Sequence, residues 1–590
     1  MTASCPPVRR PGRWLWWAVA LLVVASALAL RWNLHALGSW DDFTEACGRL
    51  WNYLRAFASP DLSASMLRTC GALALETVAV ALLGVAIGLV LAYPLALGAT
   101  RCLVHGGEPA HWAVRSVQHA VLEGCRLLLD ILRGVPDIAW AIVLANLTGV
   151  NTVTGVLAIA ISVAGIFGKV LSEQWDNVDA KHYLALRTTG ASRFAVFWYG
   201  VQPLAARTTL SFLLMRTECA VRNASVIGVV GGGGLGAQLW DEYTDGSWSR
   251  VATVLLALLV VTATTDVIAN LIRQRLRVDP NHPRASRATD RRTQAWRRLQ
   301  VLAVVLALVA GSAALLAEPF AQVTRELQRI DWDFAGSYTA GLFVPDLSLG
   351  RLAYATELGV QPAEVGTFAA LLGTLRAATE NAIVPIAIGV LATVVGGLAA
   401  AALAFPASVA FQLDAHRFVG ENLPASRRRL RWCAVVATRA LALVCRGVPE
   451  VAWVIILAVF FQIGVTPCVL AVAIHSCGVL HRVFTESLDN VAYQRLERIG
   501  GTCRPQVFLY GAVPRVWPDW RTYLFFQFEV NMRIGTALGV VGAGGLGHAF
   551  KLNLDWRQHG ATATFLWTMI LLTIVVDRLS RWLQLRRLRC

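Results

Sequence analysis

The chain contains two long copies of the same sequence. Residues 133–142 read RGVPDIAWAI and residues 446–455 read RGVPEVAWVI, so seven of ten positions are identical. Farther along, RNASVIGVVGGGGLG at 222–236 matches RIGTALGVVGAGGLG at 533–547 at nine of fifteen positions. The offsets of 313 and 311 residues are far longer than the roughly 20–50 residues of a solenoid repeat. The polypeptide therefore holds two homologous halves, an arrangement common in membrane transporters.

Composition predicts that both halves lie in a membrane. Hydrophobic residues make up 56% of the 590 positions and charged residues only 15%, whereas soluble proteins carry about 25% charged residues. Several nearly uncharged stretches approach or exceed the roughly 20 residues that a membrane span needs. We expect an all-α polytopic membrane protein of about twelve spans, six in each half. The expected spans are 14–31, 72–99, 118–145, 150–172, 203–230 and 250–272, then 300–317, 368–405, 431–458, 463–483, 514–541 and 560–579.

The charge distribution predicts the orientation of these spans. Six spans per half put both termini and the connecting segment on one side of the membrane. Segment 273–298 carries nine Arg against two Asp, whereas 318–366 carries seven acidic residues against three Arg. By the positive-inside rule, the termini and the connection face the cytoplasm. A basic linker can also bind nucleic acid, but its place beside span ends favours the topological role, so we expect no nucleic-acid partner.

The domain division follows from the same pattern. We expect a first half at 1–272, a basic cytoplasmic linker at 273–299 and a second half at 300–590. The first apolar stretch has the composition of a signal peptide, but the apolar stretch at 301–316 is its counterpart, which favours an uncleaved span.

Glycine runs and cysteines can mark a cofactor or redox site, but their context in this chain favours a structural role. The glycine runs at 231–236 and 542–547 satisfy G-x-G-x-x-G, but each ends an apolar span and does not follow a strand. We expect these glycines to break a helix or to allow close backbone contact. The chain has no G-x-x-x-x-G-K-[ST] loop, so it is not itself an ATPase of the phosphate-loop type. The twelve cysteines include no Cys-x-x-Cys pair, although Cys47 and Cys70 could form a disulfide. We expect no catalytic residue, metal or cofactor.

The loops at 173–203 and 486–514 repeat a spacing of arginine, glycine and proline. In the first copy, Arg187 and Arg193 lie three residues on either side of Gly190, and Pro203 follows that glycine by thirteen residues. The same spacing recurs in the second copy with Arg498, Gly501, Arg504 and Pro514. We expect two short amphipathic helices with a turn at the glycine, and a proline that starts the next span, where its missing N–H costs nothing.

This spacing resembles the EAA loop of bacterial ABC-importer permeases, E-A-A-x3-G-x9-I-x-L-P. Together with RGVP and the glycine run, it is similar to the phosphonate-importer permeases in particular, over about 120–275 and 433–585. The resemblance implies two tandem six-helix MetI-like halves in a bacterial inner membrane, although such permeases are usually homodimers of separate subunits. One departure is that the EAA glutamate would fall at Leu184 and Arg495.

The resemblance also implies partners and a substrate class. A dimer of separate ATP-binding subunits would dock on the two loops, and a periplasmic substrate-binding protein would deliver the substrate. That substrate would be phosphonate, phosphite or a related phosphorus oxyanion. The lipid bilayer is the remaining partner.

A charged pair inside the fifth span of each half is the second candidate site. Glu218 and Arg222 lie four residues apart, and Glu529 and Arg533 repeat the pair. Residues at this spacing share a helix face and can form an ion pair. Ionisable residues within a span tend to face the bundle interior or a water-filled path, so the two arginines could attract an anionic substrate. The alternative is that each pair only fixes its own span.

Other classes of transporter stay open at this point. An ion-coupled secondary transporter or a channel would not need paired Gly–Pro loops, and such proteins often contain inverted repeats. Six spans per half make the repeats of this chain parallel. An ABC permease for another small solute is a further alternative.

Overall fold

The computed structural model describes residues 13–32, 34, 37–104, 111–276, 287–327, 332–351, 355, 361, 365–413, 424–491 and 503–588. Every regular element within these ranges is a helix, which confirms the all-α prediction. The first half contains α1 (Arg13–Ala29), α2 (Trp40–Phe57), α3 (Ala64–Ala99), α4 (Arg101–Val104), α5 (Trp112–Gly134), α6 (Asp137–Thr148), α7 (Thr152–Asp176), α8 (Leu184–Thr188), α9 (Arg193–Val196), α10 (Gln202–Ile227), α11 (Gly234–Thr244) and α12 (Trp248–Leu276).

The second half repeats this order with its own outer helices. It contains α13 (Arg287–Leu315), α14 (Ala317–Leu327), α15 (Trp332–Phe343), α17 (Thr367–Ala407), α18 (Val409–Gln412), α20 (Ala425–Gly447), α21 (Glu450–Phe461), α22 (Val465–Asp489), α23 (Arg504–Gln506), α24 (Val513–Leu538), α25 (Gly545–Asp555) and α26 (His559–Leu588). A helix therefore lies at each of the twelve predicted spans.

The described helices include six that are each long and apolar enough to cross a membrane: α3, α7, α12, α17, α22 and α26. Two bent pairs, α13 with α14 and α20 with α21, raise the number to eight if each pair is one span. These helices support a polytopic membrane protein, and the count of twelve stays a prediction. Helices α10 and α24 occupy the predicted fifth spans, but each contains several charged residues.

The predicted third span of each half is not one straight helix. In both halves the helix breaks at the RGVP sequence, so α5 is followed by α6, and α20 by α21. The second pair is bent by 94°. Pro136 and Pro449 stand in the two breaks with extended backbone angles. Proline has no N–H for the helix ladder and disfavours a helical conformation in the residue before it. We call each broken pair an elbow.

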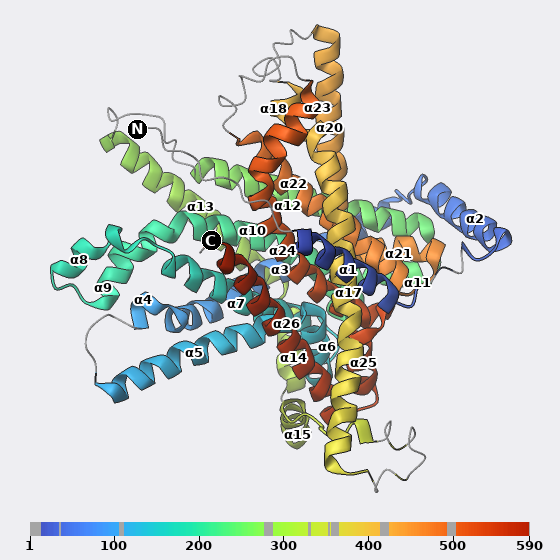
Figure 1. Cartoon of the computed structure of the whole chain (residues 1–590), viewed down its shortest axis with the longest axis horizontal. Helices are drawn as coiled ribbons and strands as arrows, with labels where there is room; N and C mark the ends of the chain where they lie inside the picture. The colour runs from blue at the N-terminus through green and yellow to red at the C-terminus, as the bar shows by residue number, and fades with distance from the viewer. Residues whose placement is uncertain are drawn as a thin grey trace.

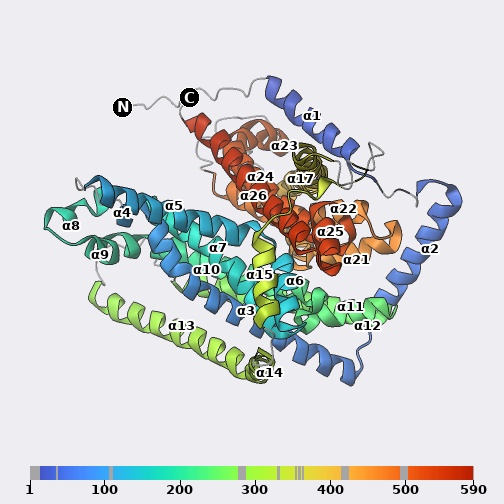
Figure 2. The same cartoon turned by 90° about the horizontal axis from the view of Figure 1, so that it is seen from below.

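The core of the molecule is shared between the two halves. Within each half, α3 packs along α7, and α17 along α22. Across the halves, α5 contacts α26, and α12 contacts α20. One hydrophobic cluster joins α6 to α25 and α26, and another joins α21 and α22 to α11 and α12. Each elbow therefore packs against the last helices of the other half, as the crossing helices in Figures 1 and 2 show.

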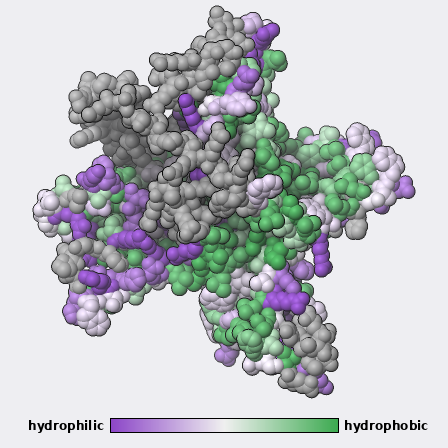
Figure 3. All heavy atoms as spheres, viewed as in Figure 1, coloured by the Kyte–Doolittle hydropathy of each residue, from purple (hydrophilic) through white to green (hydrophobic). Residues whose placement is uncertain are grey.

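The outer surface of the long helices is apolar. Val90 of α3, Val260 of α12, Leu398 of α17 and Leu571 of α26 are all more than half exposed. Figure 3 shows hydrophobic residues gathered over the middle of one face and hydrophilic residues at the projecting end near α5, α8 and α9. A lipid bilayer would cover such a belt of apolar side chains.

The glycine runs break helices and allow close backbone contact, as the sequence predicts. Gly231 (φ 99°) and Gly542 (φ 131°) have left-handed backbone angles that end α10 and α24. The chain then enters α11 and α25. A Cβ atom at Gly236 would strike the carbonyl oxygen of Ser225, and one at Gly547 would strike that of Thr536. The runs therefore serve packing within the bundle.

The disulfide that the sequence left open is not formed. Cys47 of α2 and Cys70 of α3 are both free thiols. Cys70 is buried in a hydrophobic cluster with Leu30 and Met66, where a free cysteine behaves as a small apolar side chain.

The close backbone contacts predict a sharp difference between two glycines. Gly236→Ala should destabilise the protein by about 1–3 kcal/mol, because the added methyl group would overpack a backbone contact. Gly311 lies in α13 with no atom within 4 Å of an added Cβ, so Gly311→Ala should be neutral or stabilising by up to about 1 kcal/mol. Thermal unfolding in detergent measures both. Equal effects of the two substitutions would contradict the packing role.

Candidate functional site

Arg133 of the first RGVP sequence reaches across to the second half. Its guanidinium nitrogens lie 2.9 Å from Glu529 Oε1 and 3.0 Å from Asp577 Oδ2, and 3.0 Å from Asp130 Oδ1 of its own helix. Lys169 Nζ lies 2.8 Å from Asp130 and 2.9 Å from Asp577. All five side chains are at most 13% exposed. We call these five residues the first cross-half cluster.

Arg446 of the second RGVP sequence makes the equivalent contacts in the opposite direction. It lies 2.9 Å from Glu218 Oε1 and 2.5 Å from Asp266 Oδ2, both in the first half. Arg482 Nη1 lies 3.3 Å from Asp266 Oδ1. We call Glu218, Asp266, Arg446 and Arg482 the second cross-half cluster.

The offsets of the repeat relate the two clusters residue by residue. In both, the two bases of one half meet a glutamate and an aspartate of the other half. The equivalent pairs are Arg133 with Arg446, Lys169 with Arg482, Glu218 with Glu529, and Asp266 with Asp577. The clusters differ at two positions, because Arg482 replaces Lys169 and Leu443 stands where the first half has Asp130.

The rest of RGVP has a role in the same interface. A Cβ on Gly134 would lie 3.2 Å from the Cα of Ile570 in α26. The Thr573 hydroxyl of α26 also donates a hydrogen bond of 3.1 Å to the Gly134 carbonyl oxygen. On the other side, a Cβ on Gly447 would lie 3.3 Å from Thr262 Oγ1 of α12. In each copy, therefore, the arginine pairs with the other half, the glycine allows close approach and the proline breaks the helix.

The Glu–Arg pairs of the fifth spans divide between these clusters. Glu529 forms an ion pair with Arg533 of its own helix at 3.2 Å as well as with Arg133 of the first half. Glu218 forms an ion pair with Arg446 of the other half. The structure thus brings both glutamates to the interface between the halves, which the sequence interpretation as local pairs did not anticipate.

Arg222 and Arg533 each approach the elbow region of the other half. His475, whose Nε2 lies 3.0 Å from Glu450 Oε1, is an electrostatic neighbour of Arg222. Asp137 and Arg216 of the first half are electrostatic neighbours of Arg533. Within the described part of the chain, the Nε atoms of Arg222 and Arg533 are buried and have no hydrogen-bond partner. Two arginines with unused donors therefore lie between the halves.

Sequence reasoning missed most members of the two clusters. Lys169 and Arg482, like Asp266 and Asp577, are single charges in apolar spans that recur at the offset of the repeat. Charges within spans mark functional or structural sites, so this repetition was a usable signal. Asp130 has no such counterpart, and only the structure reveals it.

The loop at 173–203 contains the two short helices that the sequence predicts. Helices α8 and α9 are separated by Gly190, whose φ is 79°. Arg187 lies on α8 with an exposed side chain. Arg193 Nη1 donates a hydrogen bond of 3.4 Å to the carbonyl oxygen of Val104, at the end of α4. Pro203 is the second residue of α10. The Arg193 side chain thus ties the loop to helix α4.

The second loop repeats the anchoring contact. Arg504 Nη1 lies 3.4 Å from the Phe411 carbonyl oxygen and 3.3 Å from Gln412 Oε1, both in α18. Pro514 is the second residue of α24. Arg498 and Gly501 lie outside the described residues. Figures 1 and 2 both place α8 and α9 far from α23, at separate projecting parts of the molecule.

Each loop begins at an aspartate held by an arginine. Asp176 lies 3.1 Å from Arg126 of α5, and Asp489 lies 2.9 Å from Arg439 of α20. Both arginines also donate to the carbonyl oxygen that ends a long helix, Ala99 or Ala407. In each half, the loop is therefore tied to the same helix that carries the RGVP arginine.

Family comparison agrees with this duplicated architecture. Residues 121–278 and 425–589, more than half of the chain, match the family of binding-protein-dependent transport system inner membrane components. The chain belongs to this family. The family match includes both elbows, both fifth spans and both loops, and members of the family are transport permeases, so this chain is a permease and not an enzyme.

Individual relatives carry related names. The phosphate-import permease protein PhnE of Mycolicibacterium smegmatis is 27% identical over 522 residues, which span 88% of this chain and 85% of that protein. The phosphite transport system permease protein PtxC of Stutzerimonas stutzeri is 27% identical over 201 residues, which span 34% of this chain and 68% of that protein. No solved structure matches the chain.

The cross-half clusters predict a large cost for removing one partner. Arg446→Ala would leave Glu218 and Asp266 buried without their main cation, which should destabilise the protein by about 3–5 kcal/mol. The measurements are the midpoint of thermal unfolding and the monodisperse yield in detergent. A matched control is Arg376→Ala, because Arg376 and its partner Glu380 are 58% and 60% exposed; its cost should be below about 1 kcal/mol. A similar loss for both variants would refute the importance of the cluster.

Proposed function

We propose that this permease imports a phosphorus oxyanion, namely phosphonate, phosphite or phosphate, as the membrane subunit of an ATP-driven importer. The observation that carries the proposal is the likeness over 88% of the chain to a phosphate-import permease. The likeness to a phosphite permease over a shorter region supports the same substrate class. Both repeats retain the buried arginines that an oxyanion would meet.

The ATP-binding partner in this proposal is a dimer that docks on the loops at 173–203 and 486–514. Arg187, Gly190, Arg193 and Pro203, with their counterparts Arg498, Gly501, Arg504 and Pro514, would shape the two docking loops. Exposed aromatic rings support a protein partner, because Tyr199 and the equivalent Tyr510 are 79% and 82% exposed. Two loops on one chain would provide one contact for each ATP-binding subunit.

A mechanical connection between loop and interface follows from the described contacts. Arg126, which holds Asp176 at the start of the loop, and Arg133 lie on the same helix, α5. Seven residues of helix span about 10 Å. Movement of the loop by the ATPase would therefore move Arg133 against α24 and α26 of the other half. Arg439 and Arg446 on α20 make the equivalent connection.

The proposed setting completes this function. The division into 1–272, 273–299 and 300–590, with both termini and the linker in the cytoplasm of a bacterium, remains our proposal for the inner-membrane topology. A periplasmic binding protein would then meet the segments at 31–70 and 318–366 on the outer face.

Reconstitution tests the proposed function directly. The chain is purified with a tag from cells that contain the candidate ATP-binding subunit, and reconstituted into vesicles with that subunit and the binding protein. We expect the ATPase to copurify and radiolabelled phosphate or phosphonate to accumulate only with ATP. Accumulation that persists without ATP, in the absence of any copurified ATPase, would overturn the importer.

Arg222 and Arg533 should contribute to anion transport if they line the path of the substrate through the membrane. Their position between the halves and their unused Nε donors support this role. Arg222→Lys and Arg533→Lys retain the charge but lose the planar fork that binds oxyanions at two points. We expect each to lower uptake roughly tenfold, a loss comparable to one charge-assisted hydrogen bond. Arg376→Lys at an exposed site is the control. Unchanged uptake at normal protein levels would exclude Arg222 and Arg533 from the path.

The turn between α8 and α9 should matter for coupling to the ATPase. Gly190 and Gly48 both have no atom within 4 Å of an added Cβ, but only Gly190 has a positive φ, 79°. Gly190→Ala should strain the turn by about 1 kcal/mol and reduce transport-stimulated ATP hydrolysis, while Gly48→Ala should not. Equal ATPase stimulation in both variants would argue against docking at this turn.

A further inference from the structure

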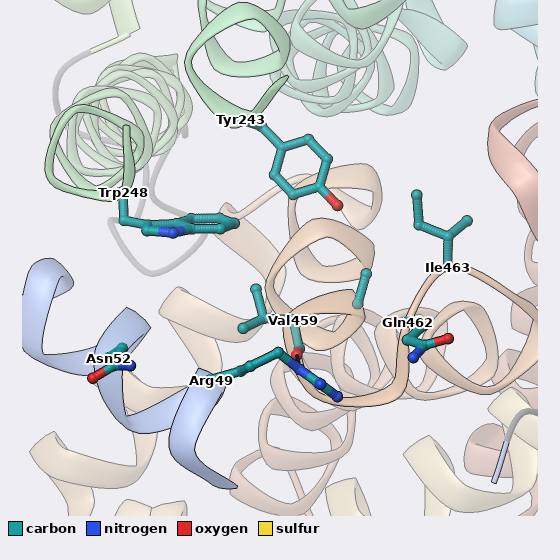
Figure 4. Close-up of a pocket in the computed structure, with 8 residues that line it drawn as sticks. Arg49, Asn52, Tyr243, Trp248, Val459, Gln462 and Ile463 are labelled. Carbon is teal, nitrogen blue, oxygen red and sulfur yellow. Dashed lines mark hydrogen bonds between the residues drawn. The ribbon is translucent and has the colours of Figure 1, made fainter. Parts of the chain in front are cut away.

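A pocket of about 530 Å³ lies where α2 and the turn between α11 and α12 meet the end of α21. It shares no residue with the cross-half clusters or the coupling loops, and the proposed orientation places it on the outer face. Figure 4 shows the side chains directed into it from both halves. The lining residues are Arg49, Asn52, Tyr243, Trp248, Ala458, Val459, Gln462 and Ile463.

Each polar side chain of this pocket can donate a hydrogen bond, and Asn52, Tyr243 and Gln462 can also accept one. Arg49 Nε lies 3.4 Å from the Val459 carbonyl oxygen, and Arg49 Nη1 lies 2.6 Å from Glu45 Oε1. These two bonds use two of the five N–H groups of a guanidinium. Glu45 is 71% exposed, so water screens its charge. In Figure 4 the guanidinium of Arg49 extends toward Gln462, and the hydroxyl of Tyr243 points toward the same space.

Gln462 holds a backbone conformation that normally requires glycine. Its φ is 65°, and the equivalent residue of the first half is Gly149 with φ 75°. A non-glycine residue in this left-handed region costs roughly 1–2 kcal/mol. The first half thus has a glycine at this turn. The second half has Gln462 in a strained backbone conformation, and the amide side chain of Gln462 lines the pocket. Strained backbone of this kind concentrates at functional sites.

The equivalent place on the other side of the molecule has different side chains. His559 and Leu554 stand where the pocket has Trp248 and Tyr243. The ring of Tyr338 from α15 packs edge-on against His559 with centroids 5.2 Å apart. Tyr338 is 1% exposed, and its hydroxyl donates a hydrogen bond of 3.1 Å to the Val143 carbonyl oxygen. The aromatic residues that line the pocket are therefore not repeated on the other side.

We propose that this pocket binds a phosphorus oxyanion through Arg49, Asn52, Tyr243 and Gln462. The inference rests on the proposed function and adds a second anion site, distant in sequence from Arg222 and Arg533. Arg binds such oxyanions through paired charge-assisted hydrogen bonds, and the volume lies within the range of small-ligand pockets. The oxyanion could come from the free substrate or from a phospholipid headgroup, since the exposed Trp40 and Trp51 of α2 are typical of a helix at the lipid interface.

Two variants and one control test the site in the full-length protein. Arg49→Gln removes the cation, and Gln462→Gly restores the residue of the first half while deleting the amide. Arg325→Gln is the control, because Arg325 is an exposed arginine of α14 in the segment expected outside. Calorimetric titration of detergent-purified protein with methylphosphonate or inorganic phosphate measures the free anion. Native mass spectrometry from phosphatidylglycerol nanodiscs counts retained lipid.

We expect Arg49→Gln and Gln462→Gly to weaken the binding of either the free anion or the lipid roughly tenfold. This is the effect of one lost charge-assisted hydrogen bond. A change in the calorimetric titration would identify the free anion as the ligand, and a change in the native mass spectrometry would identify the phospholipid headgroup. Gln462→Gly should keep or raise the unfolding temperature, because glycine relieves the strained turn, so its weaker binding would not reflect misfolding. Arg325→Gln should leave both arms unchanged.

Other outcomes overturn the site. No change in either arm, or the same change in Arg325→Gln, would show that the pocket binds no oxyanion. Loss of binding-protein association with normal anion and lipid binding would mean that the pocket is a protein-docking surface. If wild-type vesicles show no ATP-dependent uptake, the proposed function fails, whereas normal uptake with unaffected anion and lipid binding means that only this inference fails.

Discussion

Charges buried within a membrane protein must meet opposite charges, and in this permease most of those partners lie in the other half of the chain. Arg133 and Arg446 each end a helix of one half beside a glutamate and an aspartate of the other. Burial makes each group costly to leave unpaired, so the two halves depend on each other for electrostatic satisfaction. The elbows, the close glycine contacts and the shared hydrophobic clusters all bring these charges together.

The two halves are equivalent in architecture but differ in chemistry. Lysine and aspartate in the first cross-half cluster are replaced by arginine and leucine at the equivalent positions of the second half. One side carries the Arg49 pocket, whereas on the other side Tyr338 packs against His559, the counterpart of Trp248. A homodimer would have to use the same residues on both sides. A fused chain is free of that restriction, and here the two halves differ in the charge clusters and around the Arg49 pocket.

Local sequence patterns predicted the helices well, while the long-range contacts needed the structure. Each predicted span contains a helix, and apolar length selects six of these helices directly. The breaks at Pro136 and Pro449 were missed, although proline is a known interruption, because hydropathy continues through them. The Glu218–Arg222 spacing indicated a local pair, yet Glu218 binds Arg446, since spacing along one helix contains no information about a neighbouring helix. For the same reason, the contact of Arg193 with α4 was not foreseen from its place in the docking-loop pattern.

The separation of Arg133 from its partner also constrains how the protein is made. Glu529 follows Arg133 by 396 residues, which a ribosome needs about 20–80 s to translate at roughly 5–20 residues per second. During that interval the first half is inserted with its arginine, lysine and acidic side chains lacking their final counterions. Water, lipid headgroups or an insertion factor must accommodate them until the second half arrives. A chain truncated before α24 would stay in that unfinished state, which makes it a natural substrate for membrane quality-control proteases.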